Sequence, residues 1–291
     1  MVNTLGDLYL QARDRLLETE NGEYAGMAAR ELVSTLSGRS QEQFLMDRNR
    51  EAPEELCLRV SEGVERLLAG EPLPYVLGEW TFYGLPMVVS PDVLIPRDDT
   101  CALAELAIHH GLFLDPAPRI LDLCCGSGCI GLAIASRLKD ARVTLADLSR
   151  EALAVAKKNI LLNHMGGRVS CVQLDARKAP PAFLGRFDMI VSNPPYVTAA
   201  EMEQLPRSVA DFEPHMALFG GEDGLDFYRD ITSIYRSVLK PGGLMCYEFG
   251  MGQGDAVCAI LEENGFTILE RTLDYNERER AVLARYGRKE Q

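Results

Sequence analysis

Residues 121–131 combine an apolar, strand-like run with a glycine-rich turn that could bind a nucleotide. Gly126, Gly128 and Gly131 have the spacing G-x-G-x-x-G, in which glycines let the backbone approach a ligand without Cβ atoms in the way. Asp122 lies four residues before the first glycine, where its carboxylate can orient the turn and face one end of the ligand. The pattern alone fits either a nicotinamide dinucleotide or S-adenosylmethionine.

Two acidic residues follow at the ends of the next two apolar runs. Asp147 comes directly after residues 143–146, where its carboxylate can accept both hydroxyls of a ribose. Asp175 closes the run 169–174 and is placed to accept a hydrogen bond from an adenine amino group, although a helix N-cap explains it equally well. Together with the glycine turn, Asp122 and Asp147 favour S-adenosylmethionine over a nicotinamide dinucleotide.

A second chemical signal follows the buried run Phe187–Ser192, which ends abruptly in Asn193-Pro-Pro-Tyr196. Ligands of open α/β sheets lie beyond the carboxyl ends of the strands, so this tetrapeptide should reach the reactive end of the cofactor. The Asn193 side-chain oxygen and the Pro194 carbonyl can accept both N–H groups of a planar NH₂, which aims its lone pair and stabilises developing positive charge. Pro194 and Pro195 stiffen the loop, and Tyr196 offers a flat face. We predict Asn193, Pro194 and Tyr196 as catalytic residues, and all four residues as the substrate-binding residues.

The elements that must position these residues begin near residue 120. Apolar runs predict strands at 120–124, 143–146, 169–174, 187–192 and 244–248, and helical patterns lie at 130–138, 150–163, 225–239 and 255–264. Nearly continuous apolar strands that alternate with helices predict a parallel sheet covered on both faces. Residues 266–272 and 279–285 have no helix between them, so we expect them to pair antiparallel.

The N-terminal residues have a different pattern. Apolar residues at helical spacing predict a small bundle with helices near 5–16, 24–36, 41–48 and 56–67. Two prolines within residues 71–75 resist continuation of a helix. Residues 80–97 have β-type content around Gly84-Leu-Pro86, which predicts a hairpin. We therefore expect a helical domain at 1–75 and a second domain at 76–291, with 76–97 as the connecting hairpin.

Composition excludes several classes of protein. The chain has 291 residues and a net charge of −13. Residues 1–75 carry 8 basic and 14 acidic side chains and the remainder 22 and 29, so neither part has the basic surface that DNA binding requires. No apolar run is long enough to span a membrane, and the charged residues between 7 and 20 do not fit a secretory signal. The eight cysteines and four histidines show no metal-binding spacing, so we expect free thiols, no metal and a cytoplasmic protein.

The ordered motifs resemble the HemK/PrmC protein-glutamine methyltransferases, which modify the Gly-Gly-Gln loop of peptide chain release factors. Over nearly the whole chain, the shared motifs are Leu94-Ile-Pro-Arg97, the Asp122–Gly131 turn, Ala146-Asp-Leu-Ser149, Asn193-Pro-Pro-Tyr196, Phe212-Glu-Pro214 with Ala217-Leu218, Gly220-Gly-Glu-Asp-Gly-Leu225, and Glu248-Phe-Gly250 with Gln253. The resemblance implies a class I S-adenosylmethionine-dependent methyltransferase fold. This fold is α/β and Rossmann-like, with a mostly parallel seven-stranded sheet, an antiparallel terminal hairpin, and an N-terminal helical bundle that docks the release factor.

The same resemblance implies roles for individual residues. The residues implied to contact S-adenosylmethionine are Cys124, Cys125, Gly126, Ser127, Gly128, Asp147 and Asn193. The residues from Asn193 to Tyr196 would hold the substrate glutamine. Cys124 and Cys125 stand where many members have Gly and Thr, and Ala176 stands where some place an aromatic residue against the adenine.

The leading hypothesis is methylation of a glutamine side-chain amide in class I release factors. A second hypothesis is the same glutamine methylation with a large-subunit ribosomal protein as the substrate. A third is an amino-methyltransferase of DNA or RNA, which the charge of −13 disfavours. A nicotinamide dehydrogenase would leave Asn193-Pro-Pro-Tyr196 without a purpose.

Overall fold

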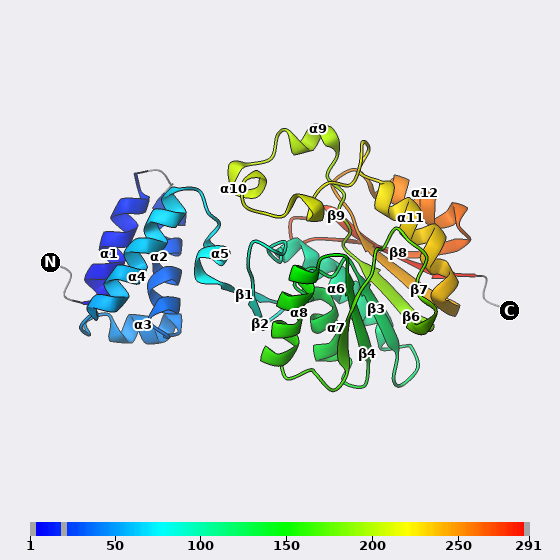
Figure 1. The fold of residues 1–291 in the computed structure, drawn as a ribbon, viewed down its shortest axis with the longest axis horizontal. Helices are drawn as coiled ribbons and strands as arrows, with labels where there is room; N and C mark the ends of the chain where they lie inside the picture. The colour runs from blue at the N-terminus through cyan, green and yellow to red at the C-terminus, as the bar shows by residue number, and fades with distance from the viewer. Residues whose placement is uncertain (1–3, 19–21, 288–291) are drawn as a thin grey trace. The chain divides into compact units, whose positions relative to one another are not determined.

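The computed structural model describes residues 4–18 and 22–287, which divide into two compact units. One unit holds the chain up to Glu79 together with Pro206–Phe212, and the other holds Trp80–Leu205 and the chain from Glu213 onward. Figure 1 shows the helical unit in blue and cyan, apart from Pro206–Phe212, which is yellow-green. Among the described residues, no helix is both long enough and apolar enough to cross a membrane.

The helical unit is a bundle whose longer helices bury apolar stripes. Its helices are α1 (Leu5–Leu16), α2 (Gly22–Leu36), α3 (Gln41–Asp47), α4 (Glu54–Leu68), α5 (Leu73–Leu77) and the short α10 (Arg207–Ala210). Thr4 and Ser40 begin α1 and α3 with reciprocal side-chain caps, because each hydroxyl accepts a backbone N–H that the first turn leaves unpaired. Leu16, Leu32 and Val64 pack in the bundle core with at most 2% of their surface exposed.

The second unit is built on a seven-stranded sheet in the order β5-β4-β3-β6-β7-β9-β8. The strands are β3 (Arg119–Leu123), β4 (Arg142–Asp147), β5 (Val169–Gln173), β6 (Phe187–Ser192), β7 (Leu239–Glu248), β8 (Phe266–Leu273) and β9 (Glu279–Tyr286). The pairs β5·β4, β4·β3, β3·β6 and β6·β7 are parallel, and β9 pairs antiparallel with both β7 and β8. The strand order reverses between β3 and β6, the position where α/β sheets bind ligands.

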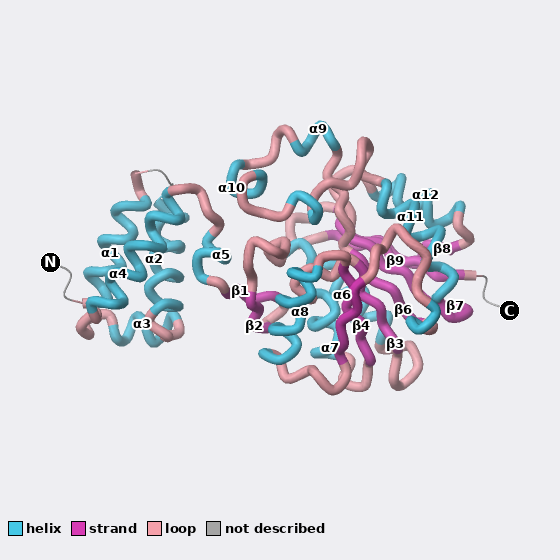
Figure 2. Tube along the Cα trace, viewed as in Figure 1, coloured by secondary structure: helices cyan, strands magenta, loops and turns pink. Residues whose placement is uncertain are grey.

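Helices cover both faces of this sheet (Figure 2). One hydrophobic core includes residues of α6 (Cys101–Gly111), α7 (Cys129–Arg137) and α8 (Arg150–Leu162). The opposite core includes residues of α11 (Asp226–Tyr235) and α12 (Gly254–Glu263). All residues of β6 are buried, because this central strand has a helical layer on each side.

A two-stranded sheet of β1 (Glu79–Phe82) and β2 (Leu85–Val88) packs on α8. The Asn159 side chain of α8 is fully buried, accepts the Val88 N–H at 2.6 Å and donates to the Val88 carbonyl at 3.0 Å. It also donates to the Ser127 carbonyl at 3.0 Å. Asn159 therefore ties the hairpin to the glycine turn of the site.

The expected sheet class, the antiparallel final pair and the N-terminal helices agree with the structure. The predicted helix 225–239 is too long, because α11 ends at Tyr235, a 3₁₀ turn spans Arg236–Val238, and β7 begins at Leu239 rather than 244. The two compact units divide between Glu79 and Trp80, and the short helix α5 begins directly after Pro72. The predicted hairpin is confirmed by β1 and β2, but it is shorter than expected, because β2 ends at Val88 and residues 92–97 are not a strand.

Candidate functional site

The glycine turn between β3 and α7 has an unusual backbone conformation. Gly126 and Gly128 have positive φ angles of 51° and 80°, and Cys124 has a φ of 58°, which is uncommon for a residue with a side chain. A Cβ at Gly131 would lie 2.3 Å from Leu145 Cδ2, so this glycine allows α7 to pack closely on β4. Such local strain concentrates at functional sites, and at Cys124 a glycine would adopt the same φ without it.

Asp147, at the end of β4, is tied to the glycine turn. Its Oδ2 accepts the Gly126 N–H at 2.8 Å, and its Oδ1 accepts the Ser149 N–H at 2.9 Å. Burial raises the pKa of this carboxyl above its ordinary value, while the backbone N–H groups act in the opposite direction. Each carboxylate oxygen can accept a second hydrogen bond, so Asp147 keeps capacity for two ligand hydroxyls.

Residues 124–127 of the glycine turn and Asp147 line a cavity of about 300 Å³ beyond the carboxyl ends of β3, β4, β5 and β6. The candidate residues on its wall are Cys124, Cys125, Gly126, Ser127, Asp147, Asp175, Asn193 and Pro195. Gly128, Pro194 and Tyr196 are not on this wall. Tyr196 instead lines a second pocket, which Val197, Gly250 and Gln253 also line. The tetrapeptide after β6 therefore contributes to both cavities.

Asn193 follows β6 at the switch point of the sheet. The preceding Ser192 pairs in register with Leu123 of β3, and its hydroxyl donates to the Leu123 carbonyl at 2.7 Å. Asn193 itself is half-buried on the cavity wall, and within residues 4–18 and 22–287 its side chain makes no hydrogen bond. A half-buried amide without a protein partner is available to a ligand.

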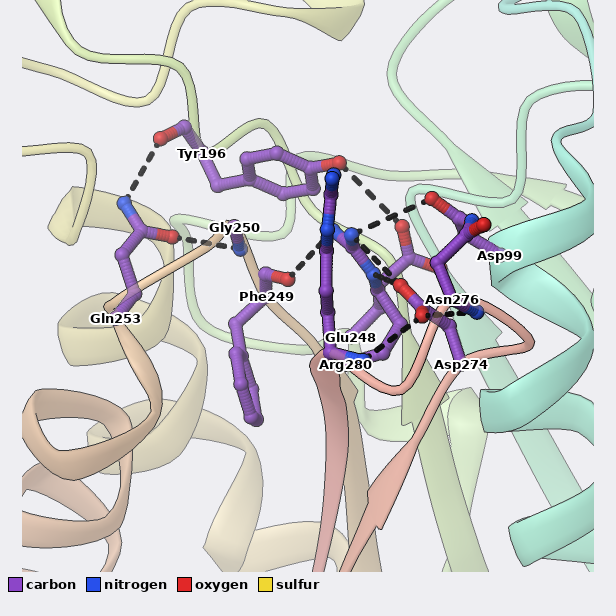
Figure 3. A network of polar contacts seen from close by, with 10 residues as sticks. Asp99, Tyr196, Glu248, Phe249, Gly250, Gln253, Asp274, Asn276 and Arg280 are labelled. Carbon is purple, nitrogen blue, oxygen red and sulfur yellow. Dashed lines mark hydrogen bonds and ion pairs between the residues drawn. The ribbon is translucent and has the colours of Figure 1, made fainter.

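Tyr196 is held by the segment that follows β7 (Figure 3). Its hydroxyl donates to Glu248 Oε1 at 3.4 Å, and its carbonyl accepts the Gln253 Nε2–H at 3.0 Å. Glu248 is fully enclosed, and burial raises its pKa to about 7. Arg280 lies beside it and binds Asp274.

The sequence interpretation missed several residues of the cavity wall. Residues 92–97, Thr100, Leu148, Ala176, Arg177, Pro214, Met216, Ala217 and Phe227 are among its lining. Glu213, which is 6% exposed, forms an ion pair with Arg97 and accepts the Ile95 N–H at 3.4 Å, so it anchors the segment over the cavity. The shared motifs signalled residues 94–97, Leu148, Pro214 and Ala217, and the resemblance puts Ala176 near the adenine. Spacing along the chain could not relate Arg97 to Glu213, because they lie 116 positions apart.

Asp122 does not face the cavity, contrary to expectation. Its Oδ2 accepts the Gly131 N–H at 2.8 Å, so it does orient the turn. Its Oδ1 is buried and has no hydrogen-bond partner among the described residues. This desolvation raises the pKa of Asp122 to about 7.

We expect Asp122→Asn to weaken the pH dependence of stability. A carboxyl whose pKa rises from 3.8 to about 7 on folding stabilises the fold below pH 3.8, and this contribution is lost as the pH rises through 7. Wild type should therefore lose stability between pH 5.5 and 8, and the variant should lose less by an amount on the order of 2 kcal/mol. Urea unfolding at both pH values measures this, with the exposed Asp140→Asn as control. An equal loss of unfolding free energy between pH 5.5 and 8 in Asp122→Asn and wild type would contradict the prediction.

Comparison with known proteins agrees with this architecture. Residues 106–209 match the methyltransferase small domain, and residues 7–78 match the PrmC N-terminal domain. The release factor glutamine methyltransferase of Clostridium acetobutylicum is 37% identical over 97% of this chain and 98% of its own length. That of Haemophilus influenzae is 34% identical over 91% and 92%. A methyltransferase structure from Pyrococcus furiosus, at 16% identity, covers 79% of this chain and 98% of its own with a TM-score of 0.52, which supports the fold. The chain thus belongs to the release factor glutamine methyltransferase family.

Proposed function

We propose that this enzyme transfers a methyl group from S-adenosylmethionine to the side-chain amide nitrogen of the glutamine in the Gly-Gly-Gln motif of class I peptide chain release factors. The observation that carries the proposal is Asn193, whose amide has no hydrogen-bond partner in the described part of the chain and lies on the wall of the cavity beside the glycine turn. The names of the relatives from Clostridium acetobutylicum and Haemophilus influenzae support the same substrate class.

The lining of the cavity fits this cofactor. Asp147 offers two carboxylate oxygens to ribose hydroxyls, and Asp175 offers an acceptor to an adenine amino group. Leu148 and Phe227 provide apolar surface on the same wall. Gly126 has no atom within 4 Å of the position that a Cβ would occupy, so this part of the turn is open to a ligand.

The tetrapeptide has the groups that an amide nitrogen needs. When bound, the cofactor supplies an electrophilic methyl group on a sulfonium, so that an N–C bond forms as the C–S bond breaks. The Asn193 side-chain oxygen and the Pro194 carbonyl accept the two N–H groups of the glutamine amide and so direct the nitrogen toward the cofactor. They also stabilise the positive charge that develops on the nitrogen, which then releases one proton to water.

Radiolabelled methyl transfer tests the proposal. The pure enzyme and labelled S-adenosylmethionine are incubated with a purified release factor, with ribosomal large subunits and with duplex DNA in parallel. We expect label on the release factor, and no label when alanine replaces the glutamine of its Gly-Gly-Gln loop. Label on ribosomes or DNA instead would overturn the proposed substrate.

We also propose that the helical unit docks the intact release factor. A chain that begins at Trp80 should keep its affinity for the cofactor, because the cavity lies wholly within the sheet-containing unit. Its kcat/KM on the intact factor should fall about tenfold or more relative to a short Gly-Gly-Gln peptide, since the loss of a docking surface weakens binding of the protein alone. Calorimetry with the cofactor verifies that the shortened chain is folded. An unchanged preference between the two substrates would contradict docking.

A further inference from the structure

The side chain of Gln253, at the N-terminus of α12, joins two backbone segments. Its Nε2 donates to the Tyr196 carbonyl at 3.0 Å, and its Oε1 accepts the Gly250 N–H at 2.9 Å (Figure 3). The orientation of the amide follows from its partners, because a carbonyl can only accept and a backbone N–H can only donate. Gln253 therefore links the segment after β7 to the candidate catalytic tetrapeptide.

Two glycines approach this contact closely. A Cβ at Gly224 would lie 2.2 Å from the Tyr196 carbonyl oxygen and 2.5 Å from Gln253 Nε2. A Cβ at Gly220 would lie 2.6 Å from the Pro195 carbonyl oxygen. The backbone of the tetrapeptide thus packs tightly against both the glycine loop 220–224 and the Gln253 side chain.

This arrangement bears on the two groups that the proposed reaction uses. The Asn193 side chain and the Pro194 carbonyl belong to a loop that two prolines stiffen, so a shift at Tyr196 is transmitted toward them. Misplacement of reacting groups by about 1 Å costs on the order of 10²-fold in rate. We propose that Gln253 is a positioning residue, which holds the Tyr196 carbonyl so that Asn193 and Pro194 are aimed at the substrate nitrogen. This inference rests on the proposed methyl transfer to glutamine.

Substitutions can separate the positioning of the Tyr196 carbonyl from the support that Gln253 gives to the turn at Gly250. Gln253→Glu keeps an oxygen that accepts the Gly250 N–H, but it places a second oxygen against the Tyr196 carbonyl. Gln253→Ala removes both contacts without adding charge. Gln204 lines the same pocket, is exposed and makes no side-chain hydrogen bond among the described residues. Gln204→Glu is thus a matched control for the added charge.

We expect Gln253→Glu to lower kcat by about 10- to 100-fold, with KM for the release factor and Kd for the cofactor within about threefold of wild type. Gln253→Ala should also lower kcat, and Gln204→Glu should stay within about twofold of wild type. Equal losses in kcat and in cofactor affinity, or a kcat loss accompanied by a general fall in Tm, would indicate a structural role and overturn the proposal.

Amide hydrogen exchange of the free enzyme supplies a readout that does not depend on activity. The Val197 N–H follows Tyr196 directly and donates to the Leu218 carbonyl at 2.9 Å. Its exchange should accelerate about tenfold or more in Gln253→Glu and remain unchanged in Gln204→Glu. Equal exchange in the two variants would overturn the positioning role. A wild-type enzyme that methylates no release factor would overturn the proposed function, and the exchange experiment would still decide the role of Gln253.

Discussion

Replacement of Asn193 by alanine is expected to lower the kcat of methyl transfer by about 10²–10³-fold, the effect of removing one preorganised polar contact to developing charge. Cofactor affinity should change by tenfold or less, about 1.4 kcal/mol, because several other residues of the cavity wall remain. Single-turnover assays give the rate, and calorimetry with S-adenosylmethionine gives the affinity.

The conservative variant Asn193→Asp sharpens this prediction. The carboxylate retains an oxygen that can accept an N–H of the substrate amide, so it should keep more activity than Asn193→Ala. Equal losses of rate and cofactor affinity in Asn193→Ala would show that Asn193 acts by binding the cofactor alone. That result would contradict its assignment to the substrate amide.

Replacement of Asp147 by alanine is expected to weaken cofactor binding by about 100-fold or more, equivalent to about 2.7 kcal/mol. The change removes the proposed acceptor of the ribose hydroxyls. It also leaves the Gly126 and Ser149 N–H groups without their present acceptor, so the turn itself loses support. Calorimetric titration with S-adenosylmethionine measures the loss.

The matching variants distinguish these causes. Asp147→Asn should also bind the cofactor poorly. Its NH₂ group must face one of the two backbone N–H groups that donate to the carboxylate in the wild type. Asp175→Ala should bind within about tenfold of wild type, since it removes one acceptor and leaves the glycine turn intact. A loss of less than tenfold in Asp147→Ala would remove this residue from the proposed cofactor site.

The local elements were predictable wherever the sequence pattern had a single physical solution. Residues 187–192 form a mainly apolar run, with Asp188 and Ser192 as its polar members, and the strand Phe187–Ser192 coincides with it. The start of β7 was not predictable, because Pro241 and Gly242 lie within residues 239–243 and their local preferences oppose a strand. Pairing with β6 stabilises this segment, and Leu239 lies in register with Phe187.

The sequence by itself determined the residues that could do the chemistry and their common edge of the sheet. Parallel strands end at one edge, so a glycine turn after β3, an acid after β4 and Asn193 after β6 must meet there.

Only the tertiary structure decided that the two ends of the tetrapeptide line different cavities. Asn193 lies on the wall of the cavity beside the glycine turn, and Tyr196 lies on the second pocket, where Gln253 and Glu248 hold it. These contacts join residues 52 and 57 positions apart, and Arg97 meets Glu213 across 116. Periodicity reports only which face of its own element a residue occupies, so contacts between distant segments depend on how the packed layers bring those segments together.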